Sequence, residues 1–421
     1  MLRVTTNYMT NNLSRNLRSH NRELDRIQNQ ISTSSRIQAP HEDPTGTALL
    51  MLYRGKMVEF GRYEKNIEDS NARLNFVDVK LQEINTYLQN IREQAVKGAN
   101  GTLTKEDREK IAIQVEQYLR QIVQTANSKF KGESIFSGFQ TNKEPYKINF
   151  GRIQGWGDPL ISKVQYQGDV GIHYREIDRG EYMGINLPGN RAFWASNQRI
   201  TSQTIATGYM AVSTNADLPY QIIKIDSVEI RIDDGDNLQT IADKINSANI
   251  PVKAEIDNTT GNDFIVLQTT RPHQLWLEDD QGSTVLQDLG LIAQGGNYPP
   301  NNYASSAIVQ GDSMFNKLVS LRDALFNNDT NGINAGLGGI DEAMDNLRAH
   351  MALVGARQSR LEIALERTSK NIVYANDIYS KIQGTDMAKA ITDLKNIELS
   401  HQAALQVGAR IIRPTLLDFL R

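Results

Sequence analysis

Apolar residues between positions 60 and 95 recur at alternating steps of three and four, and Ser70 is the one polar exception. This heptad spacing predicts a helix about 50 Å long, at 1.5 Å per residue, with one continuous apolar stripe. A stripe of this length requires a partner, and we expect it to be buried within the chain. Its central positions are Leu74, Val77, Leu81, Ile84, Leu88 and Ile91.

The same heptad spacing returns almost 300 residues later, over residues 340–382. Its positions are Leu347, Met351, Val354, Leu361, Leu365 and Ile372. A third, shorter helix is predicted over 104–130, where Thr104 and Asp107 have the spacing of a capping box. Residues 97–103 then form the turn of an antiparallel hairpin. Three unrelated core helices are the alternative, but their shared period favours one bundle, whose buried positions we call the rod seam.

Two weaker apolar seams lie at the ends of the chain, and we predict that they form an assembly interface. They comprise Leu13, Leu17, Leu24, Ile27 and Ile31, and Leu394, Ile397, Ala404, Leu405, Ile411, Leu416 and Phe419. Polar residues dilute both seams, so two isolated helices of this kind would be marginal in water. His20 and His401 occupy inward positions. We interpret them as polar residues that set a layer or lie beside solvent, rather than as a pH switch.

The composition changes between residues 146 and 304, where Gly, Pro, Asn and Asp separate short alternating stretches typical of strands. One helix, "NLQTIADKIN", interrupts them. The predicted fold is therefore mainly α, a long coiled-coil-like helical bundle built from both termini, with an inserted β-rich domain. We expect terminal helices over 1–42 and 385–421, a rod over 43–145 and 305–384, and an inserted head over 146–304.

Composition excludes several functional classes. The net charge is −3 with no block of like charges, so the sequence lacks the basic face of a nucleic-acid binder. Cysteine is absent, which excludes disulfides and thiolate chemistry. There is neither an apolar run long enough to span a membrane nor a cleavable signal peptide at the start. We expect no nucleic-acid or membrane partner.

No catalytic or metal-binding constellation stands out. The "GLGG" at 336–339 follows an Asn-rich loop and is interpreted as a flexible turn, and "IDDGDN" at 232–237 as a strand end with a helix cap. Contiguous His, Glu and Asp at 41–43 diverge too much for a metal site. The three tryptophans are interpreted as core or rim residues, with a sugar platform as the alternative. We expect no enzyme activity, cofactor or metal.

Several motifs resemble the flagellin family. "ISTSSRIQAPHEDPTGTALL" at 31–50 is similar to the segment that follows the first helix in that family, and its Asp43-Pro44 pair resembles the hook–filament junction branch. "GESIFSGFQTNKEPY" and "INLPGNRAFW" are similar to segments of that branch, whereas "VGARQSRLE" and "GTDMAKAITDL" resemble the C-terminal helices of the whole family. Residues 221–292 resemble the hook IN motif.

This resemblance implies a structural subunit that joins hook to filament and leaves the cell through the flagellar export apparatus. The implied partners are copies of itself in a ring, the first hook–filament junction protein, flagellin and an export chaperone on the C-terminal helix. Family members have terminal helices that are disordered until assembly. The implied location is the flagellum, extracellular or periplasmic.

Three alternatives remain at this point. A flagellin would belong to the same family but form the filament itself. An adhesin would act through the β-rich head and its tryptophans, and a cytoplasmic coiled-coil adaptor would use the helices alone.

Overall fold

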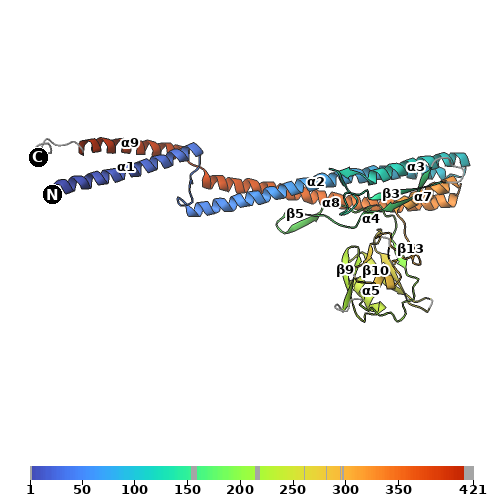
Figure 1. The fold of residues 1–421 in the computed structure, drawn as a ribbon. Coiled ribbons are helices and arrows are strands. Elements are labelled where there is room, and N and C mark those ends of the chain that lie inside the picture. The colour runs from blue at the N-terminus through green and yellow to red at the C-terminus, as the bar shows by residue number, and fades with distance from the viewer. Residues whose placement is uncertain are drawn as a thin grey trace. The chain divides into compact units, whose positions relative to one another are not determined.

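The computed structural model describes residues 2–152, 159–213, 219–259, 261–280, 282–293, 295 and 298–411. Its helices are α1 (Leu2–Thr33), α2 (Pro44–Gly98), α3 (Lys105–Ala126), α4 (Gly189–Ala192), α5 (Leu238–Ser247), α6 (Val285–Asp288), α7 (Met314–Phe326), α8 (Thr330–Gln383) and α9 (Met387–Ile411). The chain divides into a terminal unit, residues 1–65 and 364–421, and a central unit, residues 66–363. In the terminal unit, α1 and α9 lie side by side (Figure 1).

The strands of the central unit are short. They are β1 (Lys129–Phe130), β2 (Glu133–Ser134), β3 (Tyr146–Gly151), β4 (Leu160–Tyr166), β5 (Tyr174–Asp178), β6 (Glu181–Gly184), β7 (Arg199–Thr201), β8 (Tyr220–Ile225), β9 (Val228–Asp233), β10 (Val252–Asp257), β11 (Phe264–Thr269), β12 (Leu277–Asp279) and β13 (Ile308–Gln310). All pairings among them are antiparallel.

The helices of the central unit form a bundle in which the α2 stripe is fully covered. Its six predicted seam positions, from Leu74 to Ile91, have no solvent exposure. Helix α3 contacts α2 through the Tyr87 and Tyr118 rings, whose centroids are 6.1 Å apart. Helix α8 contacts α2 through an ion pair of 2.7 Å between Arg92 and Asp341. Two different helices therefore cover one stripe, which explains why both of its heptad lines are buried.

The predicted seam of α8 is covered on one side only. The heptad line that contains Leu347, Val354 and Leu361 is fully buried. The parallel line behaves differently, because its members Met351, Leu365 and Ile372 are only half-buried. Of the two predicted lines of α8, one is therefore fully buried and the other only partly. These three side chains lie at the rim of the helix interface, partly open to solvent.

The "GLGG" segment is helical, in contrast to the flexible turn that we predicted. Residues 336–339 lie within α8, whose first turns pack against α7, a helix that our reading of the sequence did not identify. A Cβ atom at Gly336 would lie 2.8 Å from Leu321, and one at Gly339 would lie 2.7 Å from the Lys317 side chain. The glycines therefore allow the two helices to approach closely, and packing outweighs their low helix propensity.

The start of α3 follows the predicted capping signal. Thr104 has extended backbone dihedrals, and its hydroxyl accepts a hydrogen bond of 3.2 Å from the Asp107 backbone N–H. Asn237 performs the same role for α5 by accepting from the Thr240 N–H at 2.9 Å. Both predicted caps, including the one in "IDDGDN", are therefore confirmed.

Two sheets, in the strand orders β10-β11-β7-β13 and β12-β8-β9, form the inserted β-rich domain (Figure 1). Strands β10 and β11 form an antiparallel hairpin, whose pairs run from Val252–Thr269 to Asp257–Phe264. Alternate side chains of β8 and β9, together with α5, form one core that extends from Ile200 to Ile292. We expected the insertion to begin at 146, but the ribbons β3–β4 and β5–β6 precede this core.

A buried ion pair joins the β3–β4 ribbon to the helical bundle. Arg322 of α7 lies 2.6 Å from Glu116 of α3, and both side chains are 2% exposed. Arg322 also donates to the Ile161 carbonyl at 2.6 Å, and Glu116 accepts from the Ile161 N–H at 3.1 Å. Each charge is thus paired and hydrogen-bonded, which is the condition under which buried charges are tolerated.

Candidate assembly interface

The two terminal seams face each other in the terminal unit. Leu13, Leu17, Leu24, Ile31, Leu394, Ile397 and Ala404 are half-buried, Ile27 is 3% exposed, and Leu405 is exposed. The helices approach closely at Gly408, where a Cβ atom would lie 2.6 Å from the Leu13 side chain. The rings of His20 and His401 meet across the same contact, with centroids 6.3 Å apart.

The two seams that we predicted as an assembly interface thus contact each other within one chain. Each seam covers much of the other within one chain, although most positions remain partly open. Leu416 and Phe419 lie outside the described residues, and Ile411 is described only as the last residue of α9.

The linkers of the terminal unit are tied together by Arg36, which belongs to the motif at 31–50. Its backbone N–H donates to the Gln383 carbonyl at 2.6 Å, and its Nε donates to the Ile382 carbonyl at 3.1 Å. Its guanidinium also pairs with Asp43 at 2.9 Å. The Gly46 N–H and Arg36 together lower the pKa of the Asp43 carboxyl. The α1–α2 linker is therefore joined to the end of α8, a role for Arg36 that sequence reasoning missed.

Helix α9 carries apolar side chains on more than the face that contacts α1. Leu399 is 65% exposed and Val407 is 53% exposed. At 100° per residue, Leu399 lies about 180° around the helix from Gly408, which marks the contact with α1. Leu405 is 49% exposed at the border of the α1 contact. A single intrachain partner cannot cover a helix that is apolar in several directions.

Further exposed apolar side chains lie on the parts of α2 and α8 within the terminal unit, and sequence reasoning missed them. They are Leu49, Met51, Leu52, Val58, Val373 and Tyr374. They fall off the heptad seam, so a search for one buried stripe passes over them. The signal that identifies those at the start of α2 is the apolar run "ALLML" at 48–52. Five consecutive apolar residues of a helix point in all directions around it, so they cannot all lie on one buried face. Large exposed apolar sets of this kind mark interaction surfaces.

Other kinds of site are not evident in the part of the chain that the structure describes. No group of three or more His, Asp or Glu side chains there is arranged to hold a metal ion. None of the described helices combines the length and the apolar character needed to cross a membrane.

Three family models match the chain. They describe the bacterial flagellin N-terminal helical region over residues 4–141, the flagellin hook IN motif over 220–270, and the flagellin C-terminal helical region over 337–420. The two terminal models together match more than half of the chain, and they cover both predicted seams.

Individual relatives are distant. Flagellar hook-associated protein 3 of Escherichia coli K12 is 22% identical over 206 residues, which is 49% of this chain. The chain spans only 60% of the length of that relative. Flagellin A of Vibrio cholerae El Tor is 21% identical over 97% of this chain and 96% of its own.

Among solved structures, the flagellar hook-associated protein 3 of Legionella pneumophila aligns with a TM-score of 0.48 and 16% identity. That alignment covers 79% of this chain and 98% of the Legionella chain. The three family models describe regions of flagellins. They match this chain in the order N-terminal helical region, hook IN motif and C-terminal helical region. The chain belongs to the flagellin family.

Proposed function

We propose that this protein is a structural subunit of the bacterial flagellum that joins the hook to the filament. The observation that carries the proposal is the terminal unit, whose α9 exposes apolar side chains in directions that α1 does not cover. A repeated head-to-tail contact through such a helix generates an open helical or ring assembly. The similarity to hook-associated protein 3 of E. coli supports the junction rather than the filament as its place.

The proposed partners follow from this position. Copies of the same chain cover the exposed faces of α9 and α2 in a ring, the first hook–filament junction protein contacts it on the hook side, and flagellin on the filament side. Before export, the same faces would be an aggregation hazard in the cytoplasm. An export chaperone that covers the C-terminal helix removes this hazard and is displaced when the subunit assembles.

The terminal helices, residues 1–42 and 385–421, are proposed to become fully ordered only on assembly. Their seams are half-buried in the single chain, so the stabilisation from packing is small compared with the entropy of ordering two long helices. Neighbouring subunits supply the remaining contacts.

Immunogold labelling of isolated flagella tests the proposal. The label is expected at the hook–filament boundary, and deletion of the gene should give cells that carry hooks without filaments and lose flagellin from the hook tip. Label along the whole filament would identify a flagellin instead, which the full-length similarity to V. cholerae flagellin A makes the second candidate. Normal filaments on the deletion strain would refute both.

A further inference from the structure

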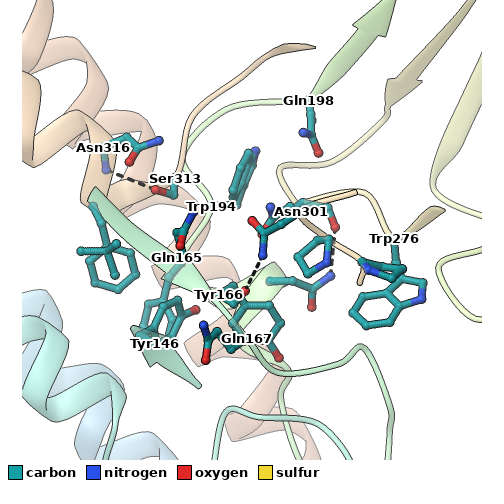
Figure 2. A pocket seen from close by; sticks show the side chains of 18 of the residues that line it. Tyr146, Gln165, Tyr166, Gln167, Trp194, Gln198, Trp276, Asn301, Ser313 and Asn316 are labelled. Atoms are coloured by element: carbon teal, nitrogen blue, oxygen red, sulfur yellow. Dashed lines mark hydrogen bonds between the residues drawn. The ribbon is translucent and has the colours of Figure 1, made fainter. Parts of the chain in front are cut away.

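A cavity of about 950 Å³ lies in the central unit, between the inserted domain and the segment that carries β4 and α4 (Figure 2). Hydrogen bonds across it fix its walls. The Gln274 N–H donates to the Asn190 carbonyl at 2.9 Å, and the Asn190 side chain donates to the Gln274 carbonyl at 3.1 Å. The Asn301 side chain donates to the Tyr166 carbonyl at 3.1 Å. The volume lies within the roughly 300–1,000 Å³ typical of small-ligand sites.

The lining has a distinctive chemistry. Eight of its residues are Asn or Gln and eight are aromatic, and two lysines are balanced by one aspartate and one glutamate. A cavity without net charge does not select an ion. Carboxamides both donate and accept hydrogen bonds, and aromatic faces pack against apolar C–H surfaces. The combination suits a neutral ligand that carries many hydroxyl groups.

Two buried polar atoms in this lining have no hydrogen-bond partner among the described residues. The first is Nε1 of Trp194, a residue that is 8% exposed. The second is Oδ1 of Asn190, a residue that is 2% exposed. One is a donor and the other an acceptor. Buried polar atoms are nearly always paired in native proteins, so each of these needs an explanation. A hydroxyl group both accepts and donates, so its chemistry matches that of both atoms.

We propose that this cavity binds a neutral saccharide. In the view of Figure 2, Trp194 and Trp276 lie on either side of the Asn301 carboxamide. Trp276 is half-buried, and its Nε1 donates to Glu278 at 3.4 Å, so its ring face remains the part that can stack on a sugar. A peptide would instead require a row of backbone donors and acceptors, whereas the unpartnered groups here belong to isolated side chains. The site belongs to the central unit, whereas the proposed assembly surface belongs to the terminal unit.

Titration of tryptophan fluorescence in the full-length chain tests the proposal. The probes are maltotriose and triacetylchitotriose as neutral saccharides, sialyllactose as an anionic one, and an uncharged hexapeptide. At least one neutral saccharide should give a saturable change, and the other two probes should not. Saturation-transfer NMR should detect sugar protons in contact with the protein, independently of fluorescence.

Two variants locate the site. Trp276→Ala removes the stacking surface of a half-buried side chain and should weaken binding about tenfold or more. Trp194→Phe removes the unpartnered donor and keeps a smaller aromatic ring, so it should weaken binding at some cost in thermal stability. Tyr182→Ala is the matched aromatic control, because Tyr182 is 59% exposed and does not line the cavity.

The proposal is overturned if neither neutral saccharide binds saturably at millimolar concentration. It is also overturned if the peptide or the anionic sugar binds as well, or if Trp276→Ala and Trp194→Phe bind the sugar as tightly as Tyr182→Ala. If Trp194→Phe does not fold, the comparison of Trp276→Ala with Tyr182→Ala still decides.

Discussion

Replacement of the exposed apolar side chains of α9 should separate assembly from folding. The change is Leu399→Gln, Leu405→Gln and Val407→Gln in one variant, since glutamine keeps a helix propensity close to that of leucine. The three side chains are 65%, 49% and 53% exposed, equivalent to about 1.7 fully exposed side chains. At about 1.5–3 kcal/mol for each aliphatic side chain buried, neighbours that cover them gain roughly 2.5–5 kcal/mol per subunit.

A loss of that size lowers the association constant by roughly a hundredfold or more, which is enough to prevent incorporation. The folded chain itself should be unaffected, because side chains that are already exposed contribute little to its stability. Circular dichroism melting of the purified variant and filament formation after complementation of a deletion strain form the paired assay. We expect an unchanged melting temperature and no filaments.

A matched control replaces three exposed polar residues of the same helix, Lys395, Glu398 and Gln406, with alanine. It should assemble normally, because it leaves the apolar faces intact. Filaments on cells that express the glutamine variant would show that the exposed faces of α9 are not the assembly surface. A large drop in its melting temperature would show that these side chains belong to the fold of the single chain.

Three further predictions concern the stability of each unit. Glu116→Gln and Arg322→Met should each lower the free energy of unfolding of the central unit, measured in urea, by about 3–5 kcal/mol. The double variant should lose much less stability, because no unpaired charge is left buried. A double variant as unstable as the single variants would contradict the pairing. Burial and neighbouring arginines lower the pKa of His350 to about 4. The unfolded chain therefore binds the proton first, so stability should fall by roughly 2 kcal/mol from pH 7.5 to 4.5, and His350→Gln should reduce this slope. Trypsin should remove both ends and leave a core of about 45–380, and amide exchange at the ends as slow as in α2 would contradict the proposed disorder.

Heptad periodicity alone predicted the long helices and the α2 stripe, because a buried helical face requires apolar residues at fixed steps whatever its partner is. Local hydrogen bonding likewise predicted the start of α3 at Thr104 and of α5 at Asn237. These features depend on neighbours within a few residues, so the sequence contains all the information needed. The change in composition between residues 146 and 304 predicted the inserted β-rich domain, and the family resemblance added its hook IN segment.

Only the tertiary structure decided which faces are covered. Leu365 and Ile372 have the same spacing as the buried Leu361, but their exposure depends on whether a second helix lies beside α8. We interpreted Gly336 as part of a turn because a local sequence pattern does not show that its packing partner is Leu321 of α7. The α1–α9 contact and the cavity beside Trp194 likewise join residues more than 80 positions apart. Periodicity indicates that one face of a helix is apolar. Which element covers that face is decided by the three-dimensional packing.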